Sequence, residues 1–154
     1  MTRQDGFWFE DMAAGQVLHS PRAITLDRDA IIAFARQYDP QPAHLGEETA
    51  KDSLFGLFCA SGWQTGSVTM RLIFETLPIV RGGMGAGIEQ LRWLRPVLPG
   101  DSLRVEITVL AVRPSASRPG SGVVTYRCTT RNQHGEPVQE FTTTVLMPRR
   151  PAPA

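Results

Sequence analysis

Residues 62–76 are the segment of this 154-residue sequence that most constrains its fold. In a helix, their apolar side chains would point in nearly every direction, which is typical of a helix buried on most sides. These apolar residues are Trp63, Val68, Met70, Leu72, Ile73 and Phe74. Pro78 then stops the helix. A chain of this length has room for one compact domain, so we expect the rest of the sequence to cover this helix.

After the helix, the pattern changes to alternation of apolar and polar residues, which indicates strands with one buried face. Such segments occupy residues 103–109, 124–128 and 141–147, and residues 88–94 precede them as another strand. Residues 16–25 are expected to form one more strand. The sequence therefore predicts an α+β fold, in which a curved antiparallel sheet of about five strands wraps around a central buried helix.

This pattern predicts a single domain over residues 1–148 and a disordered tail at residues 149–154. One sheet with one helix leaves strand edges and a face uncovered. We therefore expect a homodimer or a higher homo-oligomer.

A short helix is expected before the central one. Thr25 is its expected N-cap, and Asp27 lies in its first turn, where a carboxylate favours the helix dipole. Its apolar stripe recurs at helical spacing, at Ile31, Phe34, Ala35 and Tyr38. A further helical stretch is expected at residues 47–53.

Charge and cysteine content argue against several classes of function. The chain has 16 basic and 15 acidic residues, a net charge of +1, so no nucleic-acid partner is indicated. No apolar run approaches the roughly 18 residues of a membrane span, and the first residues lack a signal-peptide core, so we expect a cytoplasmic protein. Cys59 and Cys128 are not at metal-ligand spacing and are expected to be buried, a reactive Cys59 thiol being the less favoured alternative.

The loop at residues 39–45 holds a carboxylate and an imidazole, Asp39 and His44, five positions apart. Pro40 and Pro42 fix the path of the chain between them. A carboxylate can orient a histidine or share a water molecule with it. On these residues alone, a turn capped by Asp39 with a surface histidine is the more common explanation.

The start of the central helix offers a second feature. Ser61 and Gln64 fit a capping box, in which each side chain satisfies a backbone amide of the other residue. The amide of Gly62 would then lack a partner and could donate to a carbonyl oxygen that gains negative charge. The alternative is an ordinary helix start with this amide bonded to water.

These residues together resemble the MaoC-like family of hot-dog hydratases. The family pattern is Asp-x-Asn-Pro-x-His, then His-Gly before the central helix, and this chain has Asp39-Pro-Gln41-Pro42-Ala-His44 and Ser61-Gly62. A later Arg-Pro-Val and Gly-Asp pattern is matched between Arg95 and Asp101. Gln41 replaces the usual asparagine and Ser61 the frequent histidine.

The resemblance implies that Asp39 and His44 bind a catalytic water and that the Gly62 amide receives a thioester carbonyl, with Gln41, Pro42 and Ser61 in support. The implied reaction is reversible hydration of a trans-2-enoyl thioester to a 3-hydroxyacyl thioester, with R configuration. Coenzyme A or an acyl carrier would be the substrate handle, and no metal or other cofactor is required.

Two alternatives stay open. A hot-dog acyl-CoA thioesterase commonly uses a carboxylate on the central helix, and residues 62–70 contain none, which favours hydration. A non-catalytic acyl-thioester-binding subunit would not need both Asp39 and His44.

Other residues carry weaker expectations. The arginines that could bind coenzyme A phosphates are Arg81, Arg92, Arg95 and Arg118. Trp63 could limit the length of the acyl tail, whereas His19 and His134 are expected to be structural or solvated.

Overall fold

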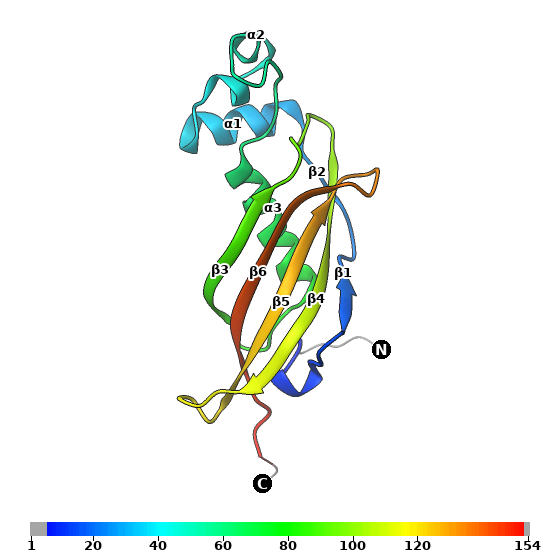
Figure 1. Cartoon of the computed structure of the whole chain (residues 1–154), viewed down its shortest axis with the longest axis vertical. Helices are drawn as coiled ribbons and strands as arrows, with labels where there is room; N and C mark the ends of the chain where they lie inside the picture. Colours follow the sequence, from blue (N-terminus) through cyan, green and yellow to red (C-terminus); the bar gives the residue numbers. More distant parts are fainter. Residues whose placement is uncertain (1–5, 153–154) are drawn as a thin grey trace.

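The computed structural model describes residues 6–152, in which one antiparallel sheet curves around a single long helix (Figure 1). The order of the strands is β1-β4-β5-β6-β3. The short strand β2 pairs with the start of β4, at residues 102–103, and β1 pairs with residues 106–108 of the same strand. The strands are β1 (Val17–His19), β2 (Ile24–Thr25), β3 (Met84–Trp93), β4 (Ser102–Pro114), β5 (Ser121–Arg131) and β6 (Pro137–Pro148). The predicted α+β hot-dog architecture is confirmed.

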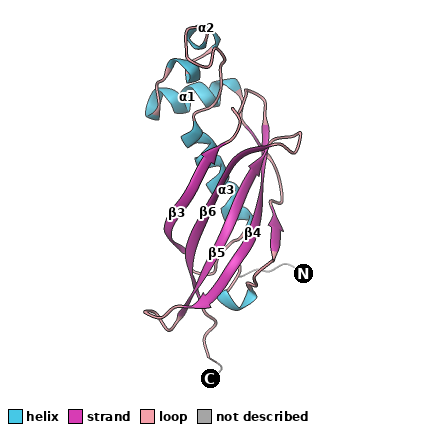
Figure 2. Cartoon of the chain, viewed as in Figure 1, coloured by secondary structure: helices cyan, strands magenta, loops and turns pink. Residues whose placement is uncertain are grey.

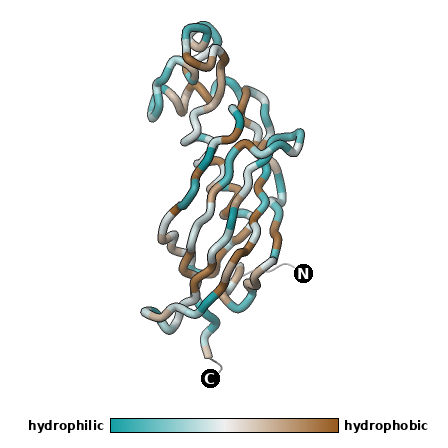
Figure 3. The backbone as a smooth tube through the Cα atoms, in the orientation of Figure 1, coloured by the Kyte–Doolittle hydropathy of each residue, from teal (hydrophilic) through white to brown (hydrophobic). Residues whose placement is uncertain are grey.

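The helix α3 (Gly62–Thr76) runs along one face of the sheet (Figure 2). Its bounds are those expected from the sequence, and Leu72 and Ile73 contribute to the core. Strand β4 shows why the alternation predicted strands: Leu103, Val105 and Ile107 are at most 2% exposed, and polar residues lie between them. Figure 3 shows this alternation along the strands. The core therefore lies between α3 and the concave face of the sheet.

One expectation about α3 is wrong. Trp63, Met70 and Phe74 are 61%, 53% and 64% exposed, so the helix is not buried on most sides. The sheet covers one side of α3, and no other described element covers the face that carries these three residues. Met84 and Ile88 of the neighbouring edge strand β3 are also more than half exposed.

The segment before α3 also differs from expectation. Residues 16–25 form two short strands rather than one. The helix α1 (Arg28–Tyr38) is capped by Asp27, whose carboxylate accepts from the Ala30 amide at 2.8 Å, and not by Thr25. The Thr25 hydroxyl is instead 2.6 Å from that of Ser102 on β4. The apolar stripe of α1 ends early, because Tyr38 is 65% exposed.

After α1, the expected irregular loop contains a 3-10 turn at Pro42–His44. The expected helical stretch is the single turn α2 (Glu47–Ala50), shorter than residues 47–53. Together α1 and α2 form a small unit beyond one end of the sheet, where α3 begins (Figure 1).

At the other end, Arg149 and Arg150 contact the N-terminal 3-10 turn Phe9–Asp11 through ion pairs with Glu10 and Asp11. The start of the predicted tail therefore has defined contacts, and residues 153–154 lie outside the described residues. The domain boundary at residue 148 stays a prediction. Within residues 6–152, no helix has both the length and the hydrophobicity to cross a membrane.

Candidate active site

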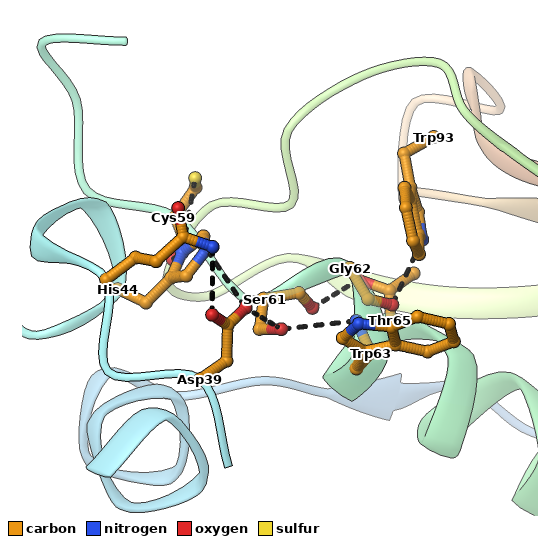
Figure 4. Close-up of polar contacts among 9 residues, drawn as sticks. Asp39, His44, Cys59, Ser61, Gly62, Trp63, Thr65 and Trp93 are labelled. Carbon is orange, nitrogen blue, oxygen red and sulfur yellow. Dashed lines mark hydrogen bonds and ion pairs between the residues drawn. The ribbon is translucent and has the colours of Figure 1, made fainter. Parts of the chain in front are cut away.

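Asp39 and His44 face each other at the junction between α1 and α3 (Figure 4). Asp39 is the C-cap residue of α1, directly after its last residue Tyr38, and the 3-10 turn that begins at Pro42 brings His44 back towards it. The distance from Asp39 Oδ2 to His44 Nε2 is 3.6 Å, and both side chains are at least four-fifths buried. The structure thus brings the predicted pair together, with both groups close enough to contact one water oxygen.

The orientation of His44 is set by a backbone carbonyl. His44 Nδ1 lies 2.7 Å from the carbonyl oxygen of Cys59, which can only accept a hydrogen bond. Nδ1 must therefore carry a hydrogen, and in the neutral ring the lone pair of Nε2 points to Asp39. This role of Cys59 could not be predicted, because nothing in the sequence indicates that residues 15 positions apart meet.

Both carboxylate oxygens of Asp39 accept hydrogen bonds. Ser61 Oγ donates to Oδ2 at 2.7 Å, and Gln41 Nε2 donates to Oδ1 at 2.9 Å. Burial raises the pKa of Asp39, but these two hydrogen bonds and the nearby His44 ring together outweigh it and hold the pKa below its usual value. Asp39 is therefore a carboxylate near neutral pH.

The expected capping box at α3 is absent. Ser61 Oγ accepts from the Trp63 amide at 3.2 Å, and Gln64 Nε2 donates to the Ala30 carbonyl instead of reaching back to Ser61. Helix packing explains the difference, since Gln64 is buried against α1 and cannot turn to Ser61. The Gly62 amide makes no hydrogen bond within residues 6–152, as expected, and its contact with a thioester stays a prediction.

Trp93, at the end of β3, covers Gly62 on one side and was not identified from the sequence. Its Nε1 donates to the Gly62 carbonyl at 3.0 Å, and a Cβ at residue 62 would overlap the indole. Glycine is therefore required at this helix start by the packing of the tryptophan, in addition to any role of its amide.

These groups surround one cavity of about 410 Å³. Asp39, Gln41, His44, Gly62 and Trp63, all predicted as site residues, line it together with Trp93. Ser61 is fully buried and acts through its contacts with Asp39 and α3. Asp39 contributes the carboxylate that lines this cavity.

Of the four candidate arginines, Arg95 lines this cavity, with its Nε 3.8 Å from Glu136. His19 lies elsewhere, on β1, with Nδ1 3.9 Å from Glu106. His134 lies in the turn between β5 and β6, beside Gln133.

The cysteines are buried, as expected. Cys59 lines the cavity, but burial raises the pKa of its thiol, which argues against a reactive thiolate. Burial, with a contribution from Glu140, raises the pKa of Cys128 to about 12. Among the described residues, no three or more His, Cys, Asp or Glu side chains are grouped to hold a metal ion.

The chain is similar in sequence and fold to known proteins. The family model described as a MaoC like domain matches residues 10–132. The chain belongs to the MaoC-like family. The crystal structure of a MaoC-like dehydratase from Rhodospirillum rubrum is 49% identical with a TM-score of 0.89, and the match covers 96% of this chain and 100% of that chain.

Two other similar proteins have hydratase names. R-hydratase PhaJ1 from Pseudomonas aeruginosa is 25% identical with a TM-score of 0.77, over 95% of this chain and 88% of that chain. Mesaconyl-CoA hydratase from Cereibacter sphaeroides is 43% identical over 72 residues, which are 44% of this chain and 21% of that protein. The match is thus to a small part of this second relative. These similarities place the chain among hydratases and dehydratases.

This MaoC-like chain differs from the usual family pattern at Gln41 and Ser61. In the structure, both residues donate hydrogen bonds to the same carboxylate, that of Asp39. The two departures therefore leave the Asp39–His44 pair assembled, with its carboxylate held on both oxygens.

Proposed function

We propose that this protein catalyses the reversible addition of water to a trans-2-enoyl thioester, giving a 3-hydroxyacyl thioester of R configuration. The observation that carries the proposal is the meeting of three groups at one cavity. A buried carboxylate, an imidazole with a defined free nitrogen and an unpaired helix-start amide are supplied by Asp39, His44 and Gly62. The R configuration rests on the family resemblance.

In the proposed reaction, a water molecule binds between Asp39 and His44 Nε2. Its oxygen forms a bond to C3 of the enoyl group while one of its protons passes to the pair. The pair delivers a proton to C2, so the enzyme returns to its starting state. Such acid–base assistance contributes roughly 10²- to 10⁴-fold to the rate.

Negative charge moves onto the thioester oxygen as C3 is attacked. The Gly62 amide, at the positive end of α3, is suited to donate to this oxygen. One preorganised donor of this kind contributes about 3 to 4 kcal/mol to transition-state stabilisation. The proposed chemistry needs an acid, a base and this donor, and it uses no metal or redox cofactor.

We propose coenzyme A or a carrier-bound pantetheine as the handle of the substrate. The mesaconyl-CoA hydratase relative supports a CoA thioester. The side chain of Arg95 is about half exposed and lines the cavity, which supports a contact between its guanidinium and a phosphate or another anionic group of the ligand.

Hydration is favoured over thioester hydrolysis by the position of the carboxylate. Asp39 lies in the loop before α3 and faces His44, and the first turn of α3 has no acidic residue. A non-catalytic binding subunit would gain nothing from burying a carboxylate beside an imidazole, because such burial costs free energy.

We also propose that a second copy of the chain covers the exposed face of α3 and β3. Strand β3 is an unpaired sheet edge, which is prone to association unless it is covered. The apolar side chains of Met70, Phe74, Met84 and Ile88 extend the same uncovered surface.

The loss of enoyl absorbance on mixing with crotonyl-CoA tests the activity. We expect the wild type to hydrate this thioester, and Asp39→Asn and His44→Ala each to lower kcat by roughly 10²- to 10⁴-fold. Circular dichroism checks that both variants are folded. Full activity in both variants would refute the proposed roles, and release of free thiol without hydration would indicate a thioesterase.

A further inference from the structure

Trp93 is held against the start of α3 by contacts that leave its indole little freedom. Its single N–H lies 3.0 Å from the Gly62 carbonyl and 2.9 Å from Gln139 Oε1, so two acceptors share it. The indole also packs where a Cβ of residue 62 would lie. Rotation of Trp93 away from the helix would break both hydrogen bonds.

The side chain of Gln139 is held in place by a hydrogen-bond network with buried threonines. It is fully buried on β6, and its Nε2 donates to Thr69 Oγ1 at 3.1 Å. Thr69 in turn shares a hydrogen bond of 2.7 Å with the Thr130 hydroxyl. Because Nε2 is used by Thr69, Oε1 is the atom of Gln139 that is left to accept from Trp93. An unpaired buried amide would cost free energy, so this network maintains the position of the indole.

An irregularity in β3 also influences the direction of the Trp93 side chain. The register of β3 with β6 shifts between Glu89 and Arg92, and Gln90 between them has a φ of +55°, which is rare for a residue with a side chain. A bulge of one residue exchanges the two faces of a strand beyond it and commonly re-aims a side chain near a functional site. Here the residue that follows the bulge at the end of the strand is Trp93.

Two cavities lie along α3 and β3, and the indole of Trp93 lines one of them. Trp93 packs edge to face against Trp63, with ring centroids 5.3 Å apart, and both line the 410 Å³ site cavity. A second cavity of about 370 Å³ lies further along the same two elements and is lined by apolar side chains such as Met70, Phe74 and Ile88. These three residues also belong to the surface proposed for the second copy, which would then form the outer wall of this cavity. Neither tryptophan lines this second cavity.

We propose that Trp93 is a specificity-determining residue, which together with Trp63 closes the space between α3 and β3 and confines the site to short acyl groups. The inference rests on the proposed function, because the thioester must lie at Gly62 for its acyl chain to meet the indole. Without Trp93, a longer chain would extend into the apolar cavity, where each buried methylene strengthens binding about fourfold.

Calorimetric titration with butyryl-CoA and octanoyl-CoA tests this, since neither saturated thioester can be hydrated. We expect the wild type to bind butyryl-CoA about tenfold more tightly than octanoyl-CoA, and Trp93→Ala to bind octanoyl-CoA at least as tightly as butyryl-CoA. Trp93→Phe keeps an aromatic ring and loses the N–H with both of its hydrogen bonds. Its preference for butyryl-CoA should therefore be weaker than that of the wild type and stronger than that of Trp93→Ala.

Trp63→Ala is a second variant, in which an exposed ring is removed without disturbing Gln139; it should also shift the preference towards octanoyl-CoA. The proposal is wrong if the wild type binds octanoyl-CoA as tightly as butyryl-CoA, or if both alanine variants are folded and keep the wild-type preference. Hydration of crotonyl-CoA is measured in parallel. A wild type that selects butyryl-CoA but hydrates nothing would refute the proposed function and support the chain-length selection.

Discussion

The carboxylate of Asp39 accepts from Ser61 on one oxygen and from Gln41 on the other. Ser61 has a further contact, since its oxygen accepts from the Trp63 amide in the first turn of α3. A hydroxyl group has one donor and two acceptor sites, so Ser61 can serve both partners at once. Through this residue, the position of the Asp39 carboxylate is tied to that of the Gly62 amide.

Ser61→Ala tests this positioning role. The hydrogen bond from Ser61 lowers the pKa of Asp39, so its removal should raise this pKa. Because the ionised carboxylate is the proposed active form, the acidic limb of the kcat/KM profile should move to higher pH. Loss of a hydrogen bond to a charged group should also lower kcat/KM at neutral pH by about tenfold or more.

Ser67→Ala is a matched control on the same helix, because Ser67 is exposed and donates to the Trp63 carbonyl without contacting Asp39. Its pH profile should match that of the wild type. If Ser61→Ala and Ser67→Ala gave the same profile, Ser61 would have no influence on the ionisation of Asp39.

Among the elements, α1 positions the site because Asp39 is its C-cap residue. At its other end, Asp27 caps the helix through the Ala30 amide. The carbonyl of the same Ala30 accepts from Gln64 of α3, so the start of α1 and the start of α3 are joined. The stability of α1 therefore bears on the placement of the site.

Asp27→Ala should lower the free energy of unfolding by about 1 kcal/mol, because a helix amide loses its cap and a negative charge leaves the positive end of the helix. Thermal unfolding at neutral pH measures the change. Asp29→Ala is the control: this carboxylate lies in the first turn, contacts Arg28 and caps no amide, so a smaller loss is expected. Equal losses would contradict the assignment of Asp27 as the cap.

At the scale of the whole molecule, the uncovered face of α3 and β3 predicts association. Ile88→Lys places a charge in the middle of this face, and burial of an unpaired charge in an interface costs several kcal/mol. We expect the wild type to be a dimer by light scattering after gel filtration, and Ile88→Lys to be a monomer at micromolar concentration.

Leu110→Lys introduces the same charged residue at another exposed apolar position. Leu110 lies on β4, which is separated from β3 by two strands of the sheet. This control should remain dimeric. A monomeric wild type would contradict the proposed second copy, and dissociation of both variants would locate the interface elsewhere.

Features that depend on neighbouring residues could be predicted from the sequence. Alternation along β4 and the apolar pattern of residues 62–76 predicted the strands and the bounds of α3, because side-chain direction follows directly from backbone period. The two prolines around Gln41 predicted a rigid loop that joins Asp39 to His44.

Which groups meet at the site depends on the tertiary structure. Ser61 is 22 residues from Asp39, and Trp93 is 31 residues from Gly62, so no local pattern could pair them. The same holds for the Cys59 carbonyl that orients His44. It also holds for the start of α3, where Gln64 bonds to the Ala30 carbonyl of α1 and not to Ser61. The physical reason is that a buried polar group bonds to whichever partner the global packing brings near, whereas helix and strand periods act over a few residues.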